Sequence, residues 1–434
     1  MAQTLAEKII CRASGRETVR PGEIVTCRVD LAMVHDSSGP RRLAPMLERL
    51  GVGVWDPDRL VVITDHFVPA FDAASAAIQV LTRDWVAAAG VRNFHDMQGV
   101  CHVVLPERGH LKPGLFVVGG DSHSCTGGAF GCFMFGVGAT DMAGVLATGE
   151  TWIRVPETIR LRWSGRLGRG VAAKDMMLAL CARLGMDGGD YQVIQYDGAA
   201  VADLPMAERV TLCNMAVELG AQTGLIAPDG VTADYLRAAG AELDGAGPDG
   251  ETGDMARWQP DPDAAYRTTL DFDAGSLAPQ VAAPHSPANA APVGEIGPVA
   301  VDRAYIGACT GAKLADLRMA AEVLRGRRVA RGTRLLVAPA SARAAEQAAA
   351  EGTLAVLAEA GADILPTGCG ACAGYGAGVL AEDEVCISAT SRNFQGRMGP
   401  GSSKVYLGSP YSVAAAAVAG RIADPREMLA EKAA

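Results

Sequence analysis

The sequence predicts an α/β fold made of two or three packed domains. Its 434 residues exceed what one ordinary hydrophobic core holds. Several short apolar runs are each followed by a loop and a helix-like stretch, the pattern of parallel α/β units; they include LVVITDH, LFVVGGDSH, RAYIGAC and RLLVAPAS. A hydrophobic share of 49% with 52 glycines suits helices that pack closely on sheets.

Two changes in composition predict the domain boundaries. A stretch at 274–298 is rich in Ala and Pro, which is typical of a linker before the αβ block that begins near Val299. Near 155–157 a helical stretch gives way to the strand-like run TIRLRW. We therefore expect α/β domains at residues 1–155, 156–275 and 276–434.

Charge and cysteine usage exclude several classes of protein. A net charge of −10 disfavours nucleic acid and anionic membranes as partners, because both attract clustered positive charge. The N-terminus lacks the pattern of a secretion signal, and no apolar run is long enough to span a membrane. The 11 cysteines are odd in number and scattered, which favours reduced thiols over a disulfide framework. We expect a cytoplasmic protein.

Polar side chains end the predicted strands. In open parallel sheets, ligands bind beyond the carboxyl ends of the strands. The residues at those ends are Asp65, His66, Asp121, Ser122, His123 and Cys309. A core histidine or a helix N-cap explains any one of them, but not all of them together.

Three cysteines stand apart from the others. Cys369 and Cys372 form a C-x-x-C within TGCGACAGYGAG, and Cys309 ends the run RAYIGAC. A lone C-x-x-C also occurs in redox pairs, in half zinc sites and as two small buried residues. The surrounding glycines let the backbone approach a bulky inorganic core.

The number of cysteine thiolates available to a cluster indicates which reaction the cluster could serve. Electron-transfer clusters normally use four thiolates, so three would leave one iron open. An open iron is a Lewis acid, which suits the removal and addition of water. The alternative is a zinc site of three cysteines and a histidine, which is disfavoured because no histidine lies near these cysteines in sequence.

Seven ordered segments resemble the aconitase and isopropylmalate dehydratase superfamily, and the resemblance covers nearly the whole chain. They are ITDHFVP, GVCHVVLPE, GGDSHSCTGGAFG, LCNMAVELGAQTG, GACTGAKLADLR, GCGACAG and SRNFQGRMG, followed by the similar tail GSPYSVAAAAVAGRIADPRE. The pattern is closest to the shorter large subunits of the superfamily. These include archaeal-type isopropylmalate dehydratases, homoaconitases and dimethylmaleate or maleate-type hydratases.

The resemblance implies the cofactor and the overall architecture. It assigns Cys309, Cys369 and Cys372 as ligands of a [4Fe-4S] cluster whose fourth iron faces the substrate. It also implies three α/β/α domains around a cleft, without the swivelling fourth domain of the superfamily.

The resemblance further implies three pairs of a histidine and a carboxylate. They are Asp65 with His66, Asp121 with His102, and Glu218 with His123. A carboxylate bonded to one ring nitrogen fixes the tautomer and raises the basicity of the imidazole. We predict that His66 is the acid that protonates the departing hydroxide.

Other residues are expected to bind substrate. Arg392 and Arg397 match arginines that grip a substrate carboxylate, for which guanidinium groups are suited. Asn214 and Glu218 lie four apart, so on a helix they would share one face. His35 falls where aconitases carry Gln and dehydratases of branched malates commonly carry His. The expected set is completed by Ser122, with Ser391 and Asn393 in support.

The remaining histidines and cysteines receive ordinary roles. We expect His95, His110 and His285 to be surface or linker residues. Packing is the better explanation for Cys101, Cys125, Cys132 and Cys213.

The chain departs from the pattern of the superfamily at three positions. Ala308 and Gly311 flank the first cluster cysteine in place of Ser and Asn, and Ser124 replaces Thr after His123. Contacts behind the ligands therefore differ, and a shifted substrate preference is an open alternative.

The resemblance predicts a hydro-lyase that shifts a hydroxyl group between neighbouring carbons of a dicarboxylate through an alkene. Isopropylmalate, in leucine biosynthesis, is the default substrate. The alternatives are dimethylmalate, citramalate, malate or maleate, and homocitrate or homoaconitate. A rival of another class is a non-catalytic, iron-sensing RNA-binding protein, which the acidic charge disfavours.

The resemblance also implies a partner. Superfamily members take the substrate proton with a serine from the fourth, mobile domain. Residues 400–434 are too few for another α/β domain. We expect a small swivelling subunit that forms a heterodimer or heterotetramer with this chain.

Overall fold

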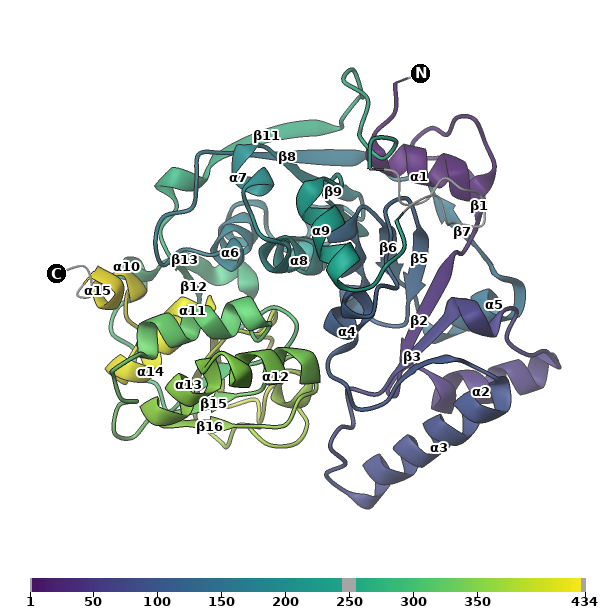
Figure 1. Cartoon of the computed structure of the whole chain (residues 1–434). Helices are drawn as coiled ribbons and strands as arrows, with labels where there is room; N and C mark the ends of the chain where they lie inside the picture. Colours follow the sequence, from purple (N-terminus) through teal and green to yellow (C-terminus); the bar gives the residue numbers. More distant parts are fainter. Residues whose placement is uncertain (1, 244–254, 431–434) are drawn as a thin grey trace.

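Three sheets flanked by helices and one two-stranded ribbon make up the described part of the chain. The computed structural model describes residues 2–243 and 255–430. In Figure 1 the second sheet lies across the top, the helices α2 (Pro40–Leu50) and α3 (Ala73–Ala89) lie at the lower right, and the C-terminal sheet with its helices lies at the lower left. The α/β fold class predicted from the sequence is confirmed.

The first sheet is parallel throughout and has the order β4-β3-β2-β5-β6. Its strands are β2 (Leu31–His35), β3 (Leu60–Ile63), β4 (Asn93–His95), β5 (Phe116–Gly119) and β6 (Phe133–Gly136). The helices of this part are α1 (Leu5–Ser14), α2, η1 (Pro57–Arg59), α3, α4 (Cys101–Glu107), η2 (Ser122–Phe130) and α5 (Ala139–Thr148). Strands β2, β3 and β5 are buried along their whole length, as expected of an apolar strand covered on both faces.

A two-stranded antiparallel ribbon closes this part of the chain. It pairs β1 (Ile24–Arg28) with β7 (Glu150–Arg154). The ribbon ends just before β8 (Thr158–Ser164), the run TIRLRW of the sequence, which begins the next sheet.

The second sheet is also parallel and has the order β10-β9-β8-β11. Besides β8, its strands are β9 (Val193–Asp197), β10 (Thr223–Leu225) and β11 (Thr268–Asp273). Its helices are α6 (Ala173–Leu184), α7 (Ala199–Ala202), α8 (Met206–Asn214), η3 (Met215–Leu219) and α9 (Gly230–Ala238). One buried apolar cluster joins Met33 and Val117 of the first sheet to Leu161 and Ile194 of the second, so the two sheets share a core.

The third sheet has seven strands in the order β13-β12-β18-β17-β14-β15-β16. They are β12 (Gln280–Ala282), β13 (Ala290–Pro292), β14 (Arg303–Ile306), β15 (Arg334–Val337), β16 (Ala362–Ile364), β17 (Val385–Ser388) and β18 (Lys404–Gly408). Its helices are η4 (Ala274–Ser276), η5 (Pro287–Asn289), α10 (Val293–Ile296), α11 (Leu314–Leu324), α12 (Ala342–Ala350), α13 (Thr353–Ala360), η6 (Gly370–Ala373), α14 (Pro410–Ala419) and α15 (Pro425–Ala430).

The stretch at 274–298 is not a linker, and this expectation was wrong. It supplies β12, β13 and α10, and β12 runs antiparallel to β18 inside the third sheet. Val281 and Val293 are buried in the core of that sheet, so two apolar anchors outweigh the Ala- and Pro-rich composition around them.

Within residues 2–243 and 255–430, no helix is both long enough and apolar enough to cross a bilayer.

Candidate active site

Three neighbouring strands of the first sheet bring polar residues to one edge. His35 is the last residue of β2, Asp65 and His66 follow β3, and Asp121 follows β5. Because β3, β2 and β5 are adjacent and parallel, their carboxyl ends meet. This is the clustering that the strand-end pattern predicts.

All three predicted pairs of a histidine and a carboxylate are in contact. Nδ1 of His66 lies 2.7 Å from Oδ1 of Asp65. Nε2 of His102 lies 2.8 Å from Oδ1 of Asp121. Nε2 of His123, in the layer of the first sheet, lies 3.1 Å from Oε1 of Glu218, in the layer of the second sheet.

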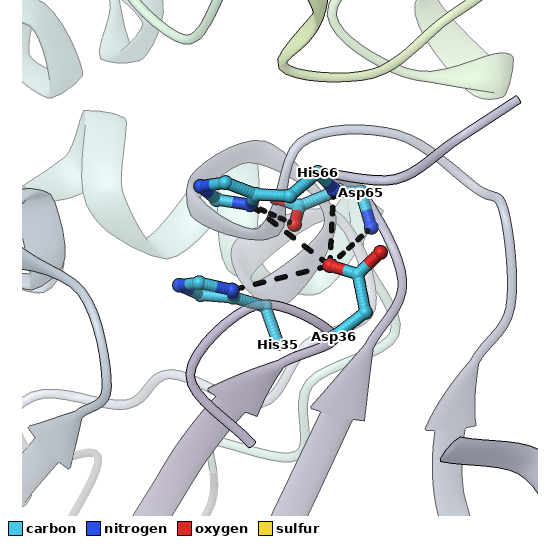
Figure 2. A group of neighbouring side chains, drawn as sticks. All are labelled: His35, Asp36, Asp65 and His66. Atoms are coloured by element: carbon cyan, nitrogen blue, oxygen red, sulfur yellow. Dashed lines mark hydrogen bonds and ion pairs between the residues drawn. The ribbon is translucent and has the colours of Figure 1, made fainter. Parts of the chain in front are cut away.

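Asp36 is a member of this site that sequence reasoning missed. Its buried carboxylate accepts the backbone N–H groups of His66 at 3.0 Å and of Phe67 at 2.9 Å. Figure 2 shows this carboxylate facing both His35 and His66, whose rings stack with their centroids 4.0 Å apart. The available signal was its place beside His35, directly after a buried strand.

The charges around His66 favour its protonated form. Burial works to lower the pKa of His66, but the adjacent Asp65 carboxylate, helped by Asp121 and Asp36, outweighs it and raises the pKa to about 9. The pKa of Asp36 is raised, first by burial and then by the nearby Asp65. His66 is therefore cationic at neutral pH and can donate a proton.

Asp121 lies among three histidines. Besides His102, it accepts the backbone N–H of His123 at 2.8 Å, and Nε2 of His35 lies 3.6 Å from its Oδ2. Although burial opposes it, contact with His102 and the other histidines holds the pKa of Asp121 well below its usual range. Burial lowers the pKa of His102 despite the carboxylate. The pKa values of His102 and His66 are thus shifted in opposite directions.

The loop after β17 brings Ser391 and Arg392 to the same edge. The hydroxyl of Ser391 lies 3.0 Å from Nε2 of His123. Arg392 donates from Nε to Glu218 at 2.5 Å and from Nη1 to Ser122 Oγ at 2.9 Å. His123 and Arg392 hold the pKa of Glu218 below its usual range against the effect of burial. Ser122 and Glu218 thereby fix the direction of the guanidinium group.

Asn214 and Glu218 both lie at the site, as expected, but not on one continuous α-helix. The α-helix ends at Asn214, and Glu218 lies in the 3₁₀ turn η3 that closes at Gly220 with φ of +73°. Both side chains are nevertheless buried at the site. Asn214 donates from Nδ2 to Thr126 Oγ1 at 2.7 Å and lies 3.3 Å from the sulfur of Cys309.

The two-cysteine loop lies directly on the first sheet's edge. The backbone N–H of Cys369 donates to the carbonyl of Asp65 at 2.9 Å, and its sulfur lies 3.7 Å from Asp65 Oδ2. A Cβ at Gly368, where φ is +145°, would lie 2.7 Å from the carbonyl oxygen of Val68. Only glycine allows this approach. Cys309 follows β14 and is buried nearby.

The donor set fits a bulky cluster better than a single zinc ion. Sulfurs that share one zinc lie roughly 3.8 Å apart, because each Zn–S bond is about 2.3 Å long. In the part of the chain that the structure describes, Cys309, Cys369 and Cys372 form no group of ligand atoms within 4.8 Å of one another. The cysteines are nevertheless neighbours, since Cys372 contributes after burial to raising the pKa of Cys309 to about 12.

Three buried polar atoms near these cysteines have no hydrogen-bond partner among the described residues. They are Oδ1 of Asn214, the hydroxyl of Tyr305 and Nε of Arg397. Nη2 of Arg397 lies 3.9 Å from the sulfur of Cys372. Buried polar groups in proteins normally find a partner, so these atoms mark a place for a polar group. Sequence reasoning missed Tyr305, which it had counted only as part of a strand.

One of the three departures from the superfamily pattern, Gly311, has a clear structural reason. Ala308 has a left-handed φ of +64°. A Cβ at Gly311 would lie 2.3 Å from the Cβ of Ala389, so this loop leaves no room for a side chain. Ser124 donates its hydroxyl to the carbonyl of Asp121 at 2.7 Å.

Two histidines expected at the surface are in contact with each other. His95 and His110 are half-buried, and their Nε2 atoms lie 2.7 Å apart. His285 is exposed. Cys101, Cys125, Cys132 and Cys213 are buried in the core, as expected. Cys101 also donates its backbone N–H to Asp65 Oδ2 at 2.7 Å.

Comparison with known proteins gives a consistent picture. The Aconitase family (aconitate hydratase) matches residues 7–420. The "3-isopropylmalate dehydratase large subunit 1" of Methanopyrus kandleri is 47% identical, over 99% of this chain and 100% of its own length. The "3-isopropylmalate dehydratase large subunit" of Moorella thermoacetica is 41% identical, over 99% and 100%. The "Probable methanogen homoaconitase large subunit" of Methanothermobacter thermautotrophicus is 42% identical, over 98% of this chain and 97% of its own length.

A solved structure, the holo-form of aconitase X from Thermococcus kodakaraensis, is similar at 12% identity with a TM-score of 0.48, over 85% of this chain and 84% of that one. Members of the Aconitase family generally bind an iron–sulfur cluster. The family match spans nearly all of the residues described above. The chain belongs to the aconitase family of hydro-lyases.

Proposed function

We propose that this chain is the large subunit of a hydro-lyase that interconverts 2-isopropylmalate and 3-isopropylmalate through an alkene. The observation that carries the proposal is the contact between the Asp65–His66 pair and the loop of Cys369. It puts a protonated imidazole beside thiols that suit an iron–sulfur cluster. The names of the relatives from Methanopyrus and Moorella support the choice of reaction.

Cys309, Cys369 and Cys372 would hold a [4Fe-4S] cluster. When bound, such a cluster with three thiolate ligands supplies an iron that acts as a Lewis acid toward a hydroxyl group. The unpartnered atoms of Asn214 and Arg397 lie where they would meet the cluster or the substrate beside it.

His66 would deliver the proton that the departing hydroxide needs. Its Nδ1 is held by Asp65, and Figure 2 shows its other ring nitrogen pointing away from the carboxylates. Its raised pKa keeps the proton in place until a stronger base forms. Asp36 holds the backbone N–H of His66, and the ring of His35 stacks on its imidazole.

Arg392 and Arg397 would bind a substrate carboxylate. Arg392 is already aimed by Glu218 and Ser122, so little conformational entropy is lost when it binds. His123 and Ser391 complete the polar wall beside it. His102 and Asp121 would support this wall, because Asp121 contacts His102 and accepts the backbone N–H of His123.

An apolar cavity beside His66 bears on the choice of substrate. It measures about 260 Å³, and its lining includes Phe71, Leu365, Pro366 and Tyr375. Apart from His66, whose proton the proposed reaction uses, its lining residues carry no positive charge. Such a cavity favours an alkyl branch over a third carboxylate, because a buried carboxylate needs a compensating charge. This supports a branched malate over homocitrate.

A small second subunit would supply the base that takes the substrate proton. The relatives are named large subunits, and this chain spans nearly their whole length. A subunit that closes over the site would also exclude water, which is a common gating step.

The test is to reconstitute the chain anaerobically with iron and sulfide, alone and with a co-produced small subunit. Alkene absorbance is then followed with 2-isopropylmalate, dimethylmalate, citramalate, malate and homocitrate. We expect turnover of 2-isopropylmalate only with both subunits. A preference for homocitrate would overturn the substrate, and full turnover by the lone chain would overturn the two-subunit assembly.

A further inference from the structure

A buried lysine to which no role was assigned above lies behind the candidate site. Lys174, near the start of α6 in the second sheet's layer, is 1% exposed. Its Nζ donates to the carbonyl oxygen of Ala389 at 2.5 Å and, at a shorter distance, to that of Thr390. Across the described ranges, no carboxylate oxygen lies within 4.0 Å of this nitrogen. Lys174 is therefore a buried amine whose hydrogen-bond partners are neutral carbonyl groups.

A buried ammonium without a counter-charge is costly. Burial lowers the pKa of Lys174 to about 7, while Cys372 and then Asp316 favour the charged form. The neighbouring Lys313 differs, because its Nζ lies 2.7 Å from Asp316 Oδ2 and is neutralised there. What Lys174 lacks is a strong anion, and thiolates that bind a metal cluster would provide that charge.

The carbonyl groups that Lys174 holds belong to the site's own loop. Ala389 and Thr390 directly precede Ser391 and Arg392. The Ala389 carbonyl also accepts the hydroxyl of Thr310, the residue after Cys309, at 3.0 Å. One ammonium group thereby ties a helix of the second layer to the loop of Arg392 and to the loop of the first cluster cysteine.

We propose that Lys174 is a positioning residue of the reaction: it fixes the carbonyl groups before Ser391 and Arg392 and supplies positive charge behind the cluster thiolates. The inference rests on the proposed function, because it needs the cluster at the three cysteines. It goes beyond that function by giving Lys174 two separable effects. The charge acts on the cluster, and the hydrogen bonds act on substrate binding through Arg392.

A variant series separates these effects from a purely structural role. Lys174→Met removes charge and donors, Lys174→Gln removes the charge and keeps a donor, and Lys174→Arg keeps both. Arg169→Met is the matched control, since it removes an exposed cation that joins the same two layers through Glu322 at 3.0 Å, away from the site. All are measured as the reconstituted two-subunit enzyme.

The first readout is the reduction potential of the cluster, measured without substrate by a titration monitored by electron paramagnetic resonance. Removing a nearby positive charge stabilises the oxidised cluster. Lys174→Met and Lys174→Gln should therefore shift the potential to more negative values, while Lys174→Arg and Arg169→Met should keep the wild-type value. The second readout is KM for 2-isopropylmalate, which should rise roughly tenfold in Lys174→Met, the effect of losing a charged hydrogen bond.

The outcomes are distinct. An unchanged potential in both uncharged variants, or an equal shift in Lys174→Arg, would overturn the inference and leave Lys174 a structural strut. If Lys174→Met fails to fold, Lys174→Gln decides the charge effect by the same measurement. A wild-type chain that takes up no cluster would instead overturn the proposed function, before any variant is compared.

Discussion

Asp36 should be necessary for the position of His66. In Asp36→Ala, the backbone N–H groups of His66 and Phe67 lose acceptors that now lie at 3.0 and 2.9 Å. Each buried donor left without a partner costs about 1–3 kcal/mol, so the free energy of unfolding should fall by roughly 2–6 kcal/mol. A displacement of about 1 Å near the reacting atoms costs roughly 100-fold in rate, so kcat should fall by about that factor.

The control is Asp36→Asn, which keeps one acceptor oxygen and loses the charge. It should lose only about 1–3 kcal/mol of stability, the cost of one unsatisfied donor. Urea denaturation measures stability, and alkene absorbance on the reconstituted two-subunit enzyme measures kcat. An Asp36→Ala variant with the wild-type denaturation midpoint and the wild-type kcat would refute the reasoning.

Four further predictions concern the proposed roles. His66→Ala should lower kcat roughly 10²–10⁴-fold and leave substrate affinity nearly unchanged in a calorimetric titration. Because burial is outweighed by Asp65, the pKa of His66 is about 9, so the wild-type kcat should fall as pH rises through that value and the acid form is lost; a flat profile there would contradict the assignment. Arg397→Lys should raise KM more than it lowers kcat in steady-state assays, because an ammonium does not reproduce a bidentate contact. Phe71→Ala should lower kcat/KM for 2-isopropylmalate roughly tenfold more than for malate. The control, a Trp152→Ala substitution of an exposed side chain, should leave kcat/KM unchanged for both substrates.

The edge of the first sheet was predictable from the sequence for a physical reason. Parallel strands with apolar runs place whatever follows them at one edge, and the polar residues after LVVI and FVVG are adjacent in the chain to those runs. The pairing of His66 with Asp65 follows from the same local geometry. The fold class needed no more than this alternation of strands and helices.

The contacts that could not be predicted from the sequence all join residues far apart in the chain. Lys174 meets Ala389 across 215 positions, and within its own helix it resembles an ordinary charged residue. Asp36 turns toward a loop that follows another strand, 30 residues away at His66. The error at 274–298 has a related cause, because the partner of β12 is β18 near the other end of the third sheet's sequence. Composition describes a segment, but not what the rest of the chain packs against it.

The hydrogen bond from the Cys369 amide to the Asp65 carbonyl links the stability of the cysteine loop to the position of the His66 acid. Loss of iron from a cysteine loop and misplacement of an acid are usually separate injuries to an enzyme. Here the loop and the strand end are bonded backbone to backbone, so we expect a shift of the cysteine loop on loss of iron to displace the Asp65–His66 pair as well. Adding iron and a reductant would then restore the cluster and the position of His66 together, so iron content and proton delivery would recover at one rate.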